Sequence, residues 1–122
     1  MKYLLAIYEN PGVWNDLPER VRADVHEGRH RFVEEIGASG ELLGRITLGD
    51  LSHGAVVQVR DGLTWVTGGL HAERADHLVG CYVVECESRE RAHAIAAMIP
   101  DTGIEGLGIE VRPIALSVGA GV

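Results

Sequence analysis

A two-residue turn, Asp61-Gly62, separates two runs of β-prone residues, AVVQVR (residues 55–60) and LTWVT (residues 63–67). An Asp-Gly pair supplies the positive φ angles that the tight turn of a β-hairpin requires. The middle of the chain therefore predicts an antiparallel hairpin, around which the other elements have to be arranged.

Further strands are predicted on both sides of this hairpin. The run KYLLAIY (residues 2–8) is β-prone, and we expect Asn10-Pro11-Gly12 to close it with a turn. The run GCYVVEC (residues 80–86) is typical of a central strand that is covered on both faces. Two more strands are expected over residues 42–48 and 109–114.

The segment between the first two strands has the signals of a long helix. Pro18 suits a first helical turn, Asn15 and Asp16 lie close enough to cap it, and Gly40 after Ser39 is a stop signal. Apolar residues recur at the helical period and predict the buried face: Val21, Val25, Phe32 and Ile36.

A second helix is predicted between Ser88, as its N-terminal cap, and Ile99, with Pro100 ending it. Its inward residues are expected to be Ala92, Ile95, Ala96 and Ile99.

The summed order of elements is β-α-β-β-β-β-α-β in 122 residues, which we interpret as one domain over residues 1–122. This order predicts an α+β fold, a ferredoxin-like sandwich in which an antiparallel sheet carries two helices on one face, with an extra hairpin. Such a sheet leaves its other face open, and an apolar open face is commonly covered by a second subunit. We therefore expect a homodimer.

Composition excludes several classes of partner. Acidic residues outnumber basic ones by 18 to 11, and no stretch combines Lys or Arg with aromatic residues, so we expect no nucleic-acid partner. The N-terminal apolar run is broken by Glu9 and Pro11 and is too short for a signal sequence or a membrane span. We expect a cytoplasmic protein with no membrane partner. Cys81 and Cys86 are interpreted as small buried hydrophobes.

The segment His26-Glu27-Gly28-Arg29-His30 matches the H-E-x-x-H pattern of zinc proteases. The longer form of that pattern is absent, because Val33 and Ile36 occupy the positions of its glycine and third histidine. Gly28 would also soften the helix that must hold both imidazoles. We therefore predict no metal site here, and leave the two histidines as either a surface pair or a functional pair in a cleft.

The stretch DGLTWVTGGLHAERADHLVGCYVVE (residues 61–85), with MKYLLAIYE at the start and IEVRPI near the end, resembles the YCII-related proteins, in particular their DGPF branch. That branch is similar to V-T-D-G-P-F-A-E-T-K-E-x-L-G-G-Y-Y-L-I-E at this point. The chain departs where the branch is named, since Gly68, Leu70 and His71 replace the aspartate, proline and phenylalanine. The matching positions are Val66, Thr67, Gly69, Ala72, Glu73, Leu78, Gly80, Tyr82 and Glu85.

The resemblance implies a ferredoxin-like fold that dimerises as a dimeric α/β barrel. It also implies, for the members that resemble enzymes, a His and Asp pair that performs acid–base elimination on small, often ring-shaped organic substrates. The family histidine lies eleven residues before the glycine that ends the first helix. In this chain that position is Arg29, with His26 and His30 beside it.

We therefore predict a recast cleft between the first helix, the sheet and residues 68–73. His71 would be the general acid or base, Glu73 would orient it, and Arg29 or His30 would hold an anionic oxygen. The residues expected to bind substrate are His26, Trp65, Gly69, Leu70 and Tyr82.

Each of these residues also has a plain structural interpretation. His71 could be an exposed loop histidine, Arg29 a helix-surface charge, and Trp65 and Tyr82 packing residues of the core or a dimer interface. His77 is interpreted as a structural, hydrogen-bonded group. His53 and His93 are expected to be solvated.

The predicted function is a cofactor-independent lyase- or cyclase-like enzyme, acting by elimination, dehydration or cyclisation on a small, largely apolar molecule of a biosynthetic pathway. No nucleotide loop or serine elbow supports a cofactor or another chemistry. The competing hypothesis is a non-catalytic module that binds a small ligand or regulates, because fold alone does not specify activity.

Overall fold

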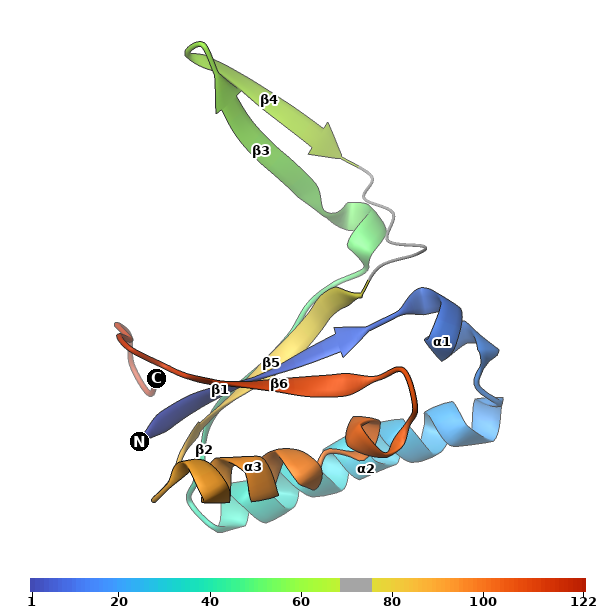
Figure 1. Cartoon of the computed structure of the whole chain (residues 1–122), viewed down its shortest axis with the longest axis vertical. Coiled ribbons are helices and arrows are strands. Elements are labelled where there is room, and N and C mark those ends of the chain that lie inside the picture. The colour runs from blue at the N-terminus through green and yellow to red at the C-terminus, as the bar shows by residue number, and fades with distance from the viewer. Residues whose placement is uncertain (69–75) are drawn as a thin grey trace.

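Four antiparallel strands form the central sheet, in the order β2-β5-β1-β6 (Figure 1). The computed structural model describes residues 1–68 and 76–122. The strands of this sheet are β1 (Lys2–Glu9), β2 (Leu42–Thr47), β5 (His77–Glu85) and β6 (Gly108–Pro113). With the two main helices as crossovers, this is the strand order of a ferredoxin-like sandwich, so the predicted fold class is confirmed.

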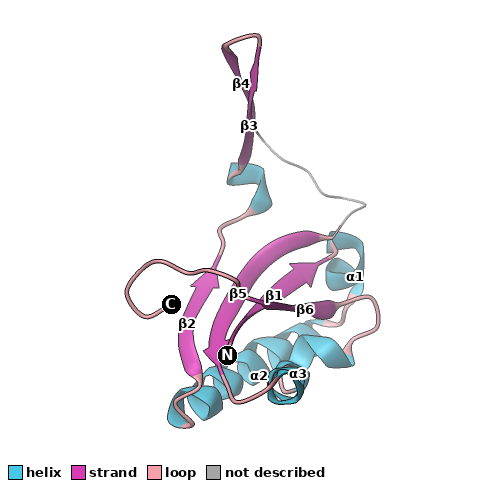
Figure 2. Ribbon diagram, turned by 60° about the vertical axis from the view of Figure 1, so that its left-hand side comes forward, coloured by secondary structure: helices cyan, strands magenta, loops and turns pink. Residues whose placement is uncertain are grey.

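Helices α2 (Glu19–Ala38) and α3 (Arg89–Ala97) cover one face of the sheet (Figures 1 and 2). The core lies between them and the sheet, where Phe32 of α2 meets Tyr82 of β5 edge to face, with 4.8 Å between ring centroids. All the predicted inward residues of α3 are buried, and on α2 Val25, Phe32 and Ile36 are buried while Val21 is half-buried.

The N-terminal connection differs from the predicted turn. Asn10 caps a short helix, α1 (Pro11–Asp16), by accepting a hydrogen bond from the Gly12 N–H at 2.9 Å, and Pro11 occupies its first turn. Asn and Pro favour helix starts as well as turns, so the local signal was ambiguous. The predicted caps Asn15 and Asp16 belong to α1, and α2 begins after Pro18 without a side-chain cap.

The other ends of the helices follow local chemistry. Gly40 has φ +81°, the left-handed conformation that stops α2. Ser88 caps α3, its side chain accepting from the Arg91 N–H at 3.0 Å. Instead of continuing to Ile99, α3 ends at Ala97, and a 3-10 turn, η2 (Pro100–Gly103), follows.

The predicted hairpin is present but lies outside the sheet. Strands β3 (Ala55–Arg60) and β4 (Leu63–Gly68) pair only with each other and project from the body (Figure 1). Asp61 and Gly62 have φ angles of 51° and 77°, as the predicted turn requires. Large apolar side chains of the hairpin are exposed on both of its faces: Val56, Val57, Val59, Leu63, Trp65 and Val66.

Residues 114–122 cross the sheet face that the helices leave uncovered. The Lys2 ammonium donates to the main-chain oxygen of Val122 at 2.9 Å, and the Val122 side chain lies against Gly44 of β2. Ala6 and Val83 of that face are buried within the single chain. The face is therefore less open than the sequence predicted.

Candidate functional site

Two cavities adjoin at the end of the sheet where β1 finishes and β5 begins. Glu9 and His77 are paired across these strands, and a bulge between Ile7 and Tyr8 shifts the register just before them. Glu9, Leu48 and Val79 line both cavities, so they form the wall between them.

The smaller cavity, about 200 Å³, lies between the sheet and α2. Gly80 lines it where β5 runs close to β2, and a Cβ atom there would lie 2.6 Å from the Ile46 carbonyl oxygen. A side chain at position 80 would therefore push β2 away. The cavity is lined by Ile7, Glu9, His26, Arg29, Arg45, Ile46, Thr47, Leu48, Val79, Gly80 and Tyr82.

Arg29 is held in this cavity by Asp101 of η2. Its Nε donates to Oδ1 at 3.0 Å and its Nη2 to Oδ2 at 2.5 Å, and the Asp101 side chain is only 1 % exposed. The Glu9 carboxylate lies 4.0 Å from the same Nη2. Burial is the largest single influence on the pKa of Arg29 and lowers it, but the hydrogen bond and charge of Asp101, together with Glu9 and Tyr82, raise the pKa by more, so this guanidinium stays charged.

Gly28 makes this ion pair possible. A Cβ at position 28 would lie 2.9 Å from Cγ of Pro100, so the bare backbone lets η2 approach α2. That approach brings Asp101 beside Arg29. The glycine inside the HEGRH segment is thus explained by helix packing.

Aromatic groups enclose Arg29 on its other side. Its guanidinium carbon lies 5.6 Å from the centroid of the Trp14 ring, within cation–π range. The ring of His26 meets Trp14 edge-on at 5.5 Å. Helix α1, which the sequence did not predict, therefore supplies one wall of the arginine site.

A second arginine, Arg45 of the edge strand β2, also lines the cavity. Its guanidinium carbon lies 5.9 Å from the centroid of the Tyr82 ring. Burial raises the pKa of the Tyr82 phenol, which Arg45 and Arg29 partly counteract, so the phenol stays protonated at neutral pH.

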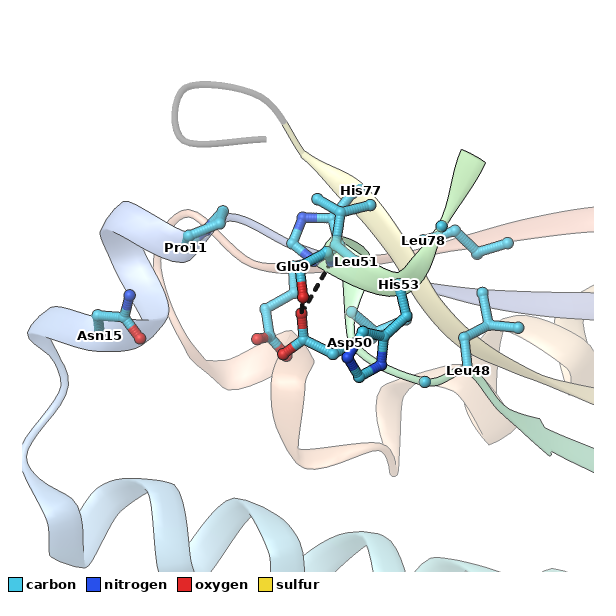
Figure 3. Close-up of a pocket in the computed structure, with 13 residues that line it drawn as sticks. Glu9, Pro11, Asn15, Leu48, Asp50, Leu51, His53, His77 and Leu78 are labelled. Atoms are coloured by element: carbon cyan, nitrogen blue, oxygen red, sulfur yellow. Dashed lines mark hydrogen bonds between the residues drawn. The ribbon is translucent and has the colours of Figure 1, made fainter. Parts of the chain in front are cut away.

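The larger cavity, about 740 Å³, opens beside Glu9 (Figure 3). Figure 3 shows Glu9, Asp50, His53 and His77 around this cavity, from β1, the η1 region (Leu51–His53) and the start of β5. Hydrogen bonds from Ser52 lower the pKa of Asp50, so this carboxylate is ionised at neutral pH.

Glu9 has the opposite tendency. Burial raises the pKa of its carboxyl above the ordinary value, and Arg29, His77 and His26 only partly compensate. Its side chain keeps 17 % of its surface exposed, so a ligand can reach it. A carboxyl of this kind exchanges protons closer to neutral pH than a solvated glutamate does.

His77 stands next to it with an unused ring nitrogen. Its Nδ1 is buried and has no hydrogen-bond partner among the described residues. Buried polar atoms are usually paired, and an exception indicates a site for water or a ligand group. The sequence favoured a structural role for His77, in which its ring is hydrogen-bonded. None of the described residues makes that hydrogen bond to Nδ1.

The structure brings together three of the residues that the sequence singled out. Arg29, His26 and Tyr82 line the smaller cavity, whereas His30 is exposed on α2 and Trp65 is exposed on the hairpin. The remaining four, Gly69, Leu70, His71 and Glu73, lie outside the described residues.

His53, expected to be solvated, is exposed and borders the larger cavity. His93 is exposed on α3. Of the two free cysteines, Cys86 is buried and Cys81 is half-buried. Within residues 1–68 and 76–122, no three potential ligands among His, Cys, Asp and Glu converge on one metal-sized site.

Sequence reasoning missed four residues of the site: Glu9, Arg45, His77 and Asp101. The one available signal was Glu9, an acidic residue that ends an otherwise apolar strand. Asp101 and Arg45 join the site only through contacts with distant parts of the chain, and no local pattern marks them.

The fold and the site define a ferredoxin-like α+β protein with an ionisable cleft at the end of its sheet. A family model, the YCII-related domain, matches residues 1–115, and the chain belongs to this family. It is also 29 % identical, over 95 % of its own length and 94 % of the relative's, to an uncharacterized protein of Rhizobium meliloti (strain 1021). In the described parts of the chain, no helix is long and apolar enough to cross a membrane.

Proposed function

We propose that the protein is a cofactor-independent acid–base enzyme that acts on a small organic molecule in the two adjoining cavities. The observation that carries this proposal is Glu9, a partly buried carboxyl of raised pKa that faces both cavities. Its neighbours are a fixed guanidinium and an imidazole with a free nitrogen. Elimination, dehydration and cyclisation each require at least a proton donor or acceptor and a cationic group that stabilises developing negative charge.

The roles follow from position. Glu9 takes the proton from carbon, because among the described residues it is the one carboxyl that lines both cavities. Arg29, fixed by Asp101, stabilises negative charge that develops near it, and His77 exchanges the second proton through Nδ1. In the same proposal, His71 and Glu73 assist from the segment that directly precedes His77 in the sequence.

We also propose that the enzyme works as a cytoplasmic homodimer. The hairpin supports a dimer, because two strands with apolar residues on both faces are marginally stable in water without a covering surface. Two free cysteines and no disulfide among the described residues fit a reducing compartment. Membership of the DGPF branch stays a prediction.

The proton-transfer step can be tested before the substrate is known. The protein is incubated in D₂O with a panel of small carbonyl and carboxylic acids that carry an acidic C–H bond, and loss of the C–H signal is followed by proton NMR. We expect exchange of at least one compound to be accelerated, and Glu9→Gln to slow it by about a hundredfold or more. Glu27→Gln, an exposed glutamate on α2, is the matched control.

The competing function, a module that only binds a ligand, predicts a different result. Compounds of the panel would then bind in the cleft, yet no C–H bond would exchange faster than in buffer. That outcome would reject the enzyme proposal.

A further inference from the structure

The smaller cavity contains a second cation, Arg45, that the proposed chemistry does not use. Arg29 is paired with Asp101, but Arg45 makes no ion pair and no side-chain hydrogen bond with any described residue. The chain carries a net charge of −7, so carboxylates are plentiful, yet none of the described ones approaches this guanidinium within ion-pair distance.

The exposed Arg45 has Tyr82 as its aromatic neighbour. The guanidinium lies over the phenol ring at 5.9 Å, and Tyr82 itself is 1 % exposed and held by Phe32. The face of an aromatic ring attracts a guanidinium without using its fork of N–H donors, which remain free to bind a ligand. Such a fork matches the two oxygens of a carboxylate.

The register of the strands sets the distance between the backbones of Arg45 and Glu9, the proposed proton acceptor. Arg45 is aligned with Tyr82, which is aligned with Leu5, four residues before Glu9. Arg45 and Glu9 are therefore separated by roughly 13 Å along the strands and roughly 10 Å across them, measured between backbones. Both residues line the smaller cavity, so a molecule bound in it lies between them.

We propose that the substrate is a small organic carboxylate whose carboxylate group binds Arg45 while its reacting carbon lies at Glu9. The assignment rests on the proposed function for the reacting end and on Arg45 alone for the anionic end. The volume of about 200 Å³ suits a compact molecule, and the apolar Ile7 and Val79 fit its carbon skeleton.

Benzoate and its neutral analogue benzamide test this assignment, with binding measured by ¹⁵N–¹H NMR including the arginine Nε–H signals. We expect saturable benzoate binding that moves the Arg45 Nε–H signal, and benzamide binding at least tenfold weaker. Arg45→Gln should weaken benzoate by about tenfold or more, the ratio expected for one charge-assisted pair. Arg112→Gln, which removes the same charge from an exposed position of β6, should leave binding unchanged.

The outcomes separate this inference from the proposed function. Three results would each overturn the carboxylate assignment. They are equal affinity of the wild-type protein for benzoate and benzamide, benzoate affinity in Arg45→Gln equal to that of the wild type, and no benzoate binding up to about 20 mM. Deuterium exchange that depends on Glu9 would survive all three results. Conversely, the protein could bind benzoate through Arg45 and yet accelerate no C–H exchange. That result would support the carboxylate site and reject the enzyme proposal.

Discussion

Arg29 and Asp101 form a two-point ion pair between α2 and η2, across 72 residues of sequence. The Asp101 side chain is 1 % exposed and that of Arg29 is 13 % exposed, so neither charge has water as a ready substitute. Their pairing fixes the guanidinium next to Glu9 and joins the C-terminal part of the fold to the site.

Removal of the Asp101 carboxylate should therefore destabilise the folded protein. Asp101→Ala removes both hydrogen bonds of a largely buried guanidinium and leaves it only the Glu9 carboxylate at 4.0 Å, and we expect the free energy of unfolding in urea to fall by about 3–5 kcal/mol. The double variant Arg29→Met with Asp101→Leu should lose much less, because it removes both charges. A loss in the double variant as large as in Asp101→Ala would mean that packing, not the charge, is responsible.

The two glycines within α2 should respond in opposite directions to alanine. Gly28→Ala places a Cβ 2.9 Å from Cγ of the rigid Pro100 ring and should lower the melting temperature. Gly37→Ala meets nothing within 4 Å and should stabilise the protein by about 0.5–1 kcal/mol, because alanine is the better helix former. Thermal unfolding followed by circular dichroism compares the two, and stabilisation of both would contradict the close contact of α2 with η2.

Ionisation of Glu9 should weaken the fold as pH rises. Its folded-state pKa is raised above the unfolded value, so its contribution to stability is present below the unfolded pKa and is lost as pH increases through the folded pKa. Glu9→Gln cannot ionise, and its melting temperature relative to wild type should rise from pH 4 to pH 7. A difference that shrinks over this range would show that the carboxylate is stabilised, not desolvated.

His71 is also a proposed catalytic residue, and its role rests on its position in the sequence alone. His71→Gln should keep the circular dichroism spectrum and lower the deuterium-exchange rate by about a hundredfold, the usual effect of a positioned acid or base. His93→Gln, exposed on α3, should change nothing. If His71→Gln is fully active, the chemistry belongs to Glu9 and His77 without help from residue 71.

Self-association should depend on the projecting hairpin. At micromolar concentration we expect a dimer mass by light scattering, and Val57→Lys with Val66→Lys, a cross-strand pair on one face of the hairpin, should shift it to the monomer. Glu34→Lys on the exposed part of α2 changes the net charge by the same two units and is the control for charge. A wild-type monomer would remove the homodimer from the proposal.

Local signals accounted for most of the elements. The Asp61-Gly62 turn, the Ser88 cap and the Gly40 stop each act over a few residues, so the backbone there follows from side-chain chemistry alone. The same reasoning was wrong at Asn10-Pro11, because asparagine and proline begin helices as readily as turns.

The sequence by itself determined the α+β class and the positions of most strands and helices, since these depend on periodicity and on short-range capping. Only the tertiary structure decided the site. Glu9 meets His77 through strand register, and Arg29 meets Asp101 because Gly28 lets Pro100 approach α2. Arg45 lies over the Tyr82 ring because β2 pairs with β5. Burial and charge pairing arise from contacts between residues far apart in the chain, and no local pattern encodes them.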